Sequence, residues 1–239
     1  MSNKQLEICV GSWESAMAAQ LGGADRIELC DNLAEGGTTP SYGMLLKCKK
    51  TLQIPFFPII RPRGGDFVFS DDEFEIMKED VIACKDLGCK GIVIGILRKD
   101  GSIDTERCAH LIDLARGLEI TFHRAFDRCN DLKKGLEDII GLGCHRVLTS
   151  GGKEYAFQGL EILKSLIIQA GLRISIMPGS GVKEQNLAQI AQETGAHEFH
   201  TTAKIKLEYG IDATTDLVFS TFETSIDKVA QLKQILSKI

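Results

Sequence analysis

The sequence lacks the features that mark membrane-spanning, secreted and nucleic-acid-binding proteins. No stretch of its 239 residues approaches the ~18 consecutive apolar residues of a membrane span, and MSNKQLEICV contains no apolar segment followed by a small-residue cleavage site. The net charge of −5 provides no basic face for phosphate contacts. We therefore expect a cytoplasmic protein with neither a membrane nor a nucleic acid as partner.

The sequence also has no CxxC pair, although it contains eight cysteines. The closest pair is Cys84 and Cys89, and no second pair lies near them, so the spacing does not favour a structural zinc site. Cysteines in cytoplasmic proteins generally stay reduced. We expect free thiols rather than a disulfide framework.

Strand-like apolar runs alternate with helix-length segments along a chain that no compositional shift or Pro/Ser-rich linker divides. The expected strands are Leu6–Val10, Arg26–Cys30, Phe56–Arg61, Gly91–Gly95, Ile120–Arg124, Arg146–Ser150, Ile174–Met177 and Glu198–Thr201. Each of the first seven is followed by a helix-length segment, and such alternation implies parallel βαβ units. We predict a single-domain (β/α)8 TIM barrel over residues 1–239, with a less regular segment near 204–222. Within that segment we expect a loop over Lys204–Phe219, and then a final helix near Thr224–Ser237.

The rival architecture is an open, doubly wound sheet. That fold places a glycine-rich phosphate turn after the first strand. Here the first strand is followed by VGSWES, which has one glycine, and the richest glycine turns follow the sixth and seventh strands. The sequence therefore indicates no nucleotide cofactor.

Polar residues gather where the expected strands end, which is where barrel enzymes place their active sites. The main ones are Cys9, Glu28, Cys30, Arg61, Arg63, His123, Arg124, Asp127 and His200. Each alone has a structural explanation, such as a buried glutamate paired with an arginine or a histidine bonded to a backbone carbonyl. Their clustering at one end of the fold favours a functional mouth.

One hypothesis for this mouth is acid–base catalysis. His123 is the candidate general acid or base, because an unperturbed imidazole titrates near neutral pH. Asp127 would orient His123 or Arg124, and Glu28 is a second candidate base.

The mouth also offers groups that suit an anion. The candidates are Arg61, Arg63, Arg124, Ser150, Gly151, Gly152, Gly179, Ser180 and Gly181. Glycine turns let backbone N–H groups converge, and barrels often bind phosphate after their last strands. The alternatives are tight turns without a ligand, and an Arg61 that pairs with Glu28. An enzyme with a small anionic or phosphorylated substrate, or a non-catalytic ligand sensor, would use the same groups.

Several long stretches of the sequence resemble the CutC copper-homeostasis family. They are GADRIELCDNLAEGGTTPS, IRPRGGDFVFS, TFHRAFD, LTSGG and PGSGV, within a similarity that runs from Leu6 to about Thr202. The resemblance implies a cytoplasmic, commonly homo-oligomeric barrel that is linked to copper tolerance and proposed to bind Cu(I). The cysteines proposed for copper in the family match Cys9 and Cys30. The run HTTA and the later IKLEYGIDATTD depart from the family pattern, which puts in doubt any function that depends on that last loop.

Copper binding has support from the residues themselves. Soft thiolates select Cu(I), and Cys9 and Cys30 end strands that are adjacent in a barrel, so one ion could bridge both sulfurs. The alternative is that both cysteines are apolar fillers of the core. Copper ion, a small anionic ligand, or both are the expected partners.

Three strands that meet when the barrel closes share a pattern of glutamate, apolar residue and soft ligand. The triplets are Glu198-Phe199-His200, Glu7-Ile8-Cys9 and Glu28-Leu29-Cys30. Side chains alternate across a strand, so the glutamates and soft ligands should face the interior and offer Cu(I) two thiolates and an imidazole. Three inward glutamates are costly to bury. Arg26 and Arg61 are the expected counter-charges, unless some of the glutamates are protonated.

Overall fold

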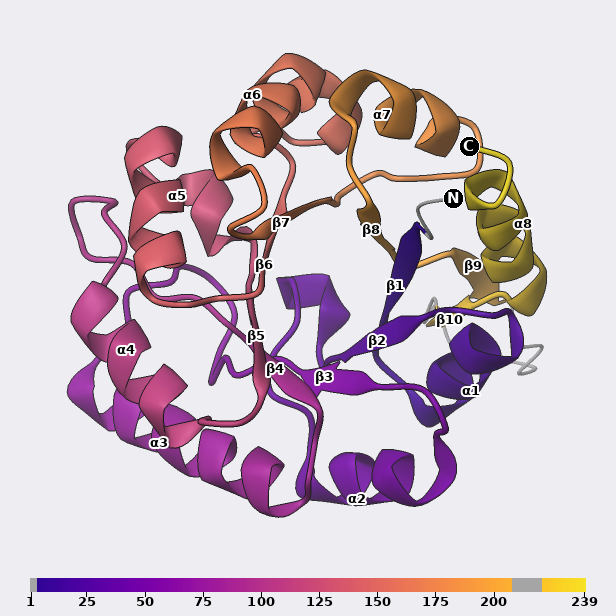
Figure 1. Cartoon of the computed structure of the whole chain (residues 1–239). Helices are drawn as coiled ribbons and strands as arrows, with labels where there is room; N and C mark the ends of the chain where they lie inside the picture. The colour runs from indigo at the N-terminus through magenta and orange to yellow at the C-terminus, as the bar shows by residue number, and fades with distance from the viewer. Residues whose placement is uncertain (1–3, 208–220) are drawn as a thin grey trace, which may run out of the picture.

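Parallel strands line the inside of the fold and helices surround them in the computed structural model, which describes residues 4–207 and 221–239 (Figure 1). The strands of the ring are β1 (Gln5–Val10), β2 (Arg26–Leu29), β3 (Phe56–Pro58), β4 (Gly91–Ile94), β5 (Glu119–Phe122), β6 (Arg146–Thr149), β7 (Ser175–Pro178) and β8 (Glu198–Thr201). They pair in the orders β3-β2-β1-β8 and β4-β5-β6-β7, a parallel bridge between Ile59 and Val93 joins the two arcs, and β7 packs beside β8. The predicted (β/α)8 barrel is confirmed.

The outer ring consists of α-helices with short 3₁₀ turns among them. The helices are α1 (Trp13–Leu21), α2 (Tyr42–Thr51), α3 (Asp71–Asp86), α4 (Thr105–Leu114), α5 (Leu132–Gly141), α6 (Leu160–Ala170), α7 (Leu187–Thr194) and α8 (Ile226–Leu236); the 3₁₀ turns are η1 (Leu33–Glu35), η2 (Arg124–Arg128) and η3 (Ala156–Gly159). Many helices begin at a Ser or Asp whose side chain accepts a hydrogen bond from a backbone N–H of the first turn. In α3, the Ser70 side chain accepts the Glu73 N–H and the Glu73 side chain accepts the Ser70 N–H, which forms a capping box. None of the helices in the described part of the chain is long and apolar enough to cross a membrane.

Alternation along the strands separates two buried layers. Ile8, Leu29 and Phe199 belong to the large apolar core between strands and helices, whereas Cys9 and Cys30 belong to a small cluster inside the barrel. The outward and inward directions predicted for these triplets are therefore observed. The C-terminal ends of the strands open at the mouth, and their N-terminal ends form the floor.

The segment near 204–222 is more regular at its ends than predicted. β9 (Lys204–Leu207) pairs antiparallel with β10 (Thr221–Thr224), so the expected loop is wrong for residues 204–207. The alternating KIKL pattern is typical of a strand. Its partner strand, β10, begins only at Thr221, so a local sequence pattern does not reveal the pairing. The remainder of the expected loop, from 208, lies outside the described residues. The final helix is found as α8, which packs against α1 and α7.

Candidate functional site

The floor of the barrel interior is a network of ion pairs among Glu7, Arg26, Glu119, Arg146 and Glu198. Arg26 pairs with Glu7 through Nε and with Glu198 through Nη2, at 2.7 Å from Oε2. Arg146 pairs with Glu119 at 2.6 Å and with Glu198 at 3.1 Å. Arg26 is thus the counter-charge that the sequence predicted, while Arg61 does not pair with any of the three inward glutamates. Sequence reasoning missed Arg146, although it opens an apolar strand as Arg26 does.

A chain of polar contacts climbs from this floor toward the mouth. His200 Nδ1 lies 2.8 Å from Glu7 Oε1, and His200 Nε2 lies 3.5 Å from Glu28 Oε2. Burial would raise the pKa of Glu7, but the Arg26 charge and the His200 hydrogen bond outweigh it and lower that pKa to about 2. Burial would lower the pKa of His200, but contacts with Cys9 and the two carboxylates raise it well above its ordinary value. His200 is therefore an imidazolium held between two carboxyl groups.

Two cysteines lie at the end of this chain of contacts, and Cys9 lines the cavity. The Sγ atoms of Cys9 and Cys30 are 3.6 Å apart, and both lie within 4.8 Å of a Glu28 carboxylate oxygen. The contact with Cys30 and burial raise the pKa of the Cys9 thiol well above its usual range. The contact with Cys9 lowers the pKa of Cys30, but burial and the nearby carboxylates outweigh it and raise this pKa to about 11. Burial also raises the pKa of Glu28, although the His200 charge opposes this effect. Both thiols are therefore protonated at neutral pH.

Arg61 follows β3, the neighbour of β2, and its side chain binds backbone carbonyls. Its Nη1 donates to the carbonyl oxygens of Glu35 and Gly37, and its Nη2 donates to that of Gly65, all at 2.8 Å. The pairing with Glu28 that the sequence allowed is not observed. Arg61 is 3% exposed, and its Nε has no hydrogen-bond partner among the described residues.

His123 ends β5 and is also buried, at 3% exposed. Its Nδ1 accepts the backbone N–H of Ala125 at 3.1 Å, so the ring proton is on Nε2, which has no partner among the described residues. Burial and the Arg61 charge lower the pKa of His123 to about 3. A neutral imidazole in this tautomer is a hydrogen-bond donor to the cavity, which fits poorly with the predicted role as general base. Gly95 makes room for the ring, because a Cβ there would collide with Cε1 of His123.

These two unpartnered atoms share an aromatic neighbour that sequence reasoning missed. The Phe67 ring centroid is 4.8 Å from Arg61 Cζ and 5.0 Å from the His123 ring centroid. An unsatisfied buried donor costs about 1–3 kcal/mol, so a folded protein seldom keeps such a donor without use. Phe67 lies in an irregular loop, where hydrophobic periodicity gives no signal.

The first glycine turn is already occupied by a side chain of the protein. The Asp127 carboxylate accepts the backbone N–H groups of Ser150 at 3.0 Å and Gly152 at 2.9 Å, and also the Thr149 and Ser150 hydroxyls. The Gly151 N–H donates to Thr149 Oγ1. Anion binding predicted at Ser150, Gly151 and Gly152 is therefore corrected, because these donors are used internally. Asp127 does not orient His123, but it does bind Arg124 Nε at 2.8 Å.

The second glycine turn, Gly179–Gly181, is only partly used. The Gly179 N–H donates to the Thr149 carbonyl and Ser180 Oγ donates to the Glu154 carbonyl. Among the described residues the N–H groups of Ser180 and Gly181 donate no hydrogen bond, and both residues line the cavity. Anion binding here stays a prediction.

The other two candidate arginines differ in position. Arg124 lines the cavity and also donates to Ser150 Oγ at 3.0 Å. Arg63 is not part of the cavity wall; it pairs with Glu73 and Asp66 on the surface. Its predicted place in an anion site is therefore corrected.

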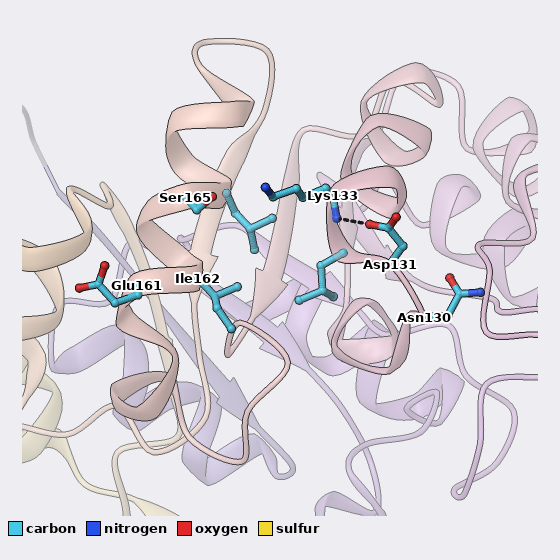
Figure 2. A pocket seen from close by; sticks show the side chains of 8 residues that line it. Asn130, Asp131, Lys133, Glu161, Ile162 and Ser165 are labelled. Atoms are coloured by element: carbon cyan, nitrogen blue, oxygen red, sulfur yellow. Dashed lines mark hydrogen bonds between the residues drawn. The ribbon is translucent and has the colours of Figure 1, made fainter.

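The cavity at the mouth has a volume of about 920 Å³ and brings together groups from most of the strands. Its wall includes Cys9, Glu28, Arg61, Phe67, His123 and His200. A second hollow lies on the outer surface between α5 and α6 (Figure 2). There Asp131 accepts from Lys133 N and Lys134 N and so caps α5 itself.

The remaining cysteines do not form a comparable group. Cys84 and Cys89 interact with each other in the apolar core between helices and strands. Among the described residues, Cys9, Glu28 and Cys30 form the one group of three potential metal ligands. Cys144 is buried at the opposite end of the strands from the mouth, and burial raises its pKa to about 12.

Fold and site together define a (β/α)8 barrel with a buried dithiol at its mouth. The chain belongs to the CutC family, whose model matches residues 4–205. It is 50% identical over 206 residues to the human copper homeostasis protein cutC homolog, covering 86% of this chain and 76% of the relative. The structure of a CutC protein from Streptococcus agalactiae matches with a TM-score of 0.80 and 38% identity, over 83% of this chain and 98% of that one.

Barrels of much lower sequence identity match at the level of the fold alone. Thiamine phosphate pyrophosphorylase from Pyrococcus furiosus gives a TM-score of 0.62 at 13% identity, over 99% of this chain and 97% of that one. Such a likeness says nothing about the chemistry at the mouth.

Proposed function

We propose that this chain is a cytoplasmic copper-homeostasis protein that binds Cu(I) through the thiolates of Cys9 and Cys30. The observation that carries the proposal is the 3.6 Å separation of the two Sγ atoms. Metal–sulfur bonds of about 2.3 Å allow the two sulfurs on one metal ion to be at most ~4.6 Å apart, so one ion fits between them with little movement. Soft thiolates prefer Cu(I) to harder cations. The names of the relatives, which refer to copper homeostasis, agree with this chemistry.

Copper binding at this position must displace protons. Both thiols are protonated at neutral pH. The contact with Cys30 and burial raise the pKa of Cys9. The contact with Cys9 lowers the pKa of Cys30, but burial and the nearby carboxylates outweigh it. The thiolate is the form that binds metal. We expect each Cu(I) to release two protons and the affinity to rise with pH.

His200 fits the role of counter-charge better than that of third ligand. One Cu(I) with two thiolates carries a net charge of −1, which is costly to bury without compensation. The imidazolium of His200 interacts with Cys9 and is held by Glu7 at 2.8 Å. It would neutralise the charge of the complex while the two cysteines provide both bonds to the metal.

Competition against a colorimetric Cu(I) chelator in reducing buffer tests the proposal. Cys9→Ser and Cys30→Ser should each weaken binding by about 100-fold or more, since loss of a ligand exceeds the 10–100-fold effect of an outer-shell partner. Cys84→Ser and Cys144→Ala are matched controls, because both remove a buried thiol outside the group. Equal binding by all four variants and the parent would reject the dithiol site. Size-exclusion chromatography tests the homo-oligomer that the family resemblance implies.

A further inference from the structure

The cavity wall also contains two hydrogen-bond donors that have no part in the proposed copper site. Arg61 Nε and His123 Nε2 are buried, and neither has a partner among the described residues. Both side chains line the cavity at the mouth. Every other nitrogen of these two side chains has a fixed partner, so the unpartnered atoms are the ones that a bound molecule can satisfy.

The structure determines the polarity of both atoms. Arg61 Nε is a donor in any protonation state that a protein reaches. His123 Nε2 is a donor because Nδ1 accepts the Ala125 N–H. The site therefore presents two N–H groups and a single positive charge, since Arg61 forms no ion pair with a described residue and His123 is neutral.

These properties decide between kinds of anion. A phosphate monoester carries about −1.5 to −2 charges and three acceptor oxygens, which exceed what one guanidinium and one imidazole can balance. The N–H groups of the first glycine turn cannot help, because Asp127 occupies them. The unused N–H groups of Ser180 and Gly181 follow β7, which is two strands from β5 and its His123 and is not a neighbour of β3. A carboxylate has one negative charge and two oxygens, which matches one cation and two donors. The Phe67 ring beside both donors offers an apolar surface to the carbon chain of such a ligand.

We infer that the mouth of this barrel binds a small organic acid, whose carboxylate accepts hydrogen bonds from Arg61 Nε and His123 Nε2. The site is distinct from the dithiol, which lies at the ends of β1 and β2. Cys9, Arg61 and His123 all line the same cavity of about 920 Å³, which has room for acid and copper together. The inference does not depend on copper binding.

The experiment measures thermal unfolding in acetate, lactate, benzoate, inorganic phosphate and chloride at equal ionic strength. At least one carboxylate should raise the Tm above its value in chloride. His123→Asn removes the Nε2 donor but keeps an acceptor for the Ala125 N–H, and Arg61→Lys keeps the charge but removes Nε. Both variants should lose the carboxylate response. Arg63→Lys is the matched control on the surface and should retain it, as should the Cys9→Ser/Cys30→Ser double variant.

A second measurement on the unaltered protein guards against variants that fail to fold. In ¹⁵N-histidine NMR, the protonated Nε2 resonance of His123 should shift on titration with the acid that gives the largest Tm increase. Three results would overturn the inference: no carboxylate exceeds chloride, phosphate stabilises as strongly as the best carboxylate, or the His123 resonance stays unchanged at saturation. Loss of the response in the double cysteine variant would place the acid on the dithiol instead.

Discussion

Arg26 at the floor of the barrel lies between the carboxylates of Glu7 and Glu198, whereas Arg61 at the mouth binds only carbonyl oxygens and keeps one N–H unpartnered. The two side chains are almost equally buried, at 5% and 3% exposed. At the floor each charge has an opposite charge, so the network is complete without a ligand. At the mouth, two buried donors have no partner among the described residues, and the two thiols are protonated. The difference separates the residues that hold the barrel together from those available for function.

Removal of a positive charge from the floor should have the largest effect on stability. Arg26→Met would leave Glu7 and Glu198 buried without their shared cation. Such a loss lowers the free energy of unfolding by about 3–5 kcal/mol. Arg173→Met is the matched control, because its pair with Glu137 is about half exposed and should contribute ~1 kcal/mol or less. Urea denaturation measures both. A loss in Arg26→Met no larger than in Arg173→Met would show that the floor is not a stabilising unit.

Acid should weaken the floor through Glu7. The pKa of Glu7 is lowered from 4.5 to about 2, so in that range the unfolded chain binds more protons than the folded one. Its contribution is therefore present above pH 4.5 and is lost as pH falls toward 2. The shift corresponds to about 3 kcal/mol. Glu7→Gln should flatten the fall in stability between these pH values, and an unchanged slope would count against the ion-paired floor.

The carboxyl group at the mouth should respond with the opposite sign. Burial raises the pKa of Glu28, so above 4.5 the folded chain holds a proton that the unfolded chain has released. Its contribution is present at low pH and is lost as pH rises through the raised pKa. Glu28→Gln should raise the Tm at pH 7, by about 2–4 °C for each kcal/mol gained in a chain of this size. A lower Tm in scanning calorimetry would show that contacts such as the His200 charge stabilise ionised Glu28 more than burial destabilises it.

The floor could be predicted in large part from the sequence, and the mouth could not. Alternation in ELC, EIC and EFH placed Glu28, Glu7 and Glu198 inside the barrel, because a strand has a fixed period of two. Arg26 followed from the need for a counter-charge. Arg146 has the same signal at the start of an apolar strand, but its partner Glu198 comes from a distant part of the chain.

At the mouth, the residue types were identifiable but their partners were not. Ser150 and Gly152 suggested an anion site, yet the anion is Asp127, and only tertiary structure brings its carboxylate to their N–H groups. The His123 tautomer depends on one backbone N–H in the turn that follows. Loop conformations of this kind follow no hydrophobic period, so sequence patterns leave them undetermined.

We expect the two cysteines at the mouth, and no others, to be the copper ligands. X-ray absorption at the copper edge can be measured on protein loaded with one equivalent of Cu(I) under reducing conditions. Copper should have two sulfur neighbours and no nitrogen neighbour in the parent, in His200→Gln and in Cys84→Ser, and should lose this coordination in Cys9→Ser and Cys30→Ser. A two-sulfur spectrum that survives the loss of Cys9 or Cys30 would contradict this expectation.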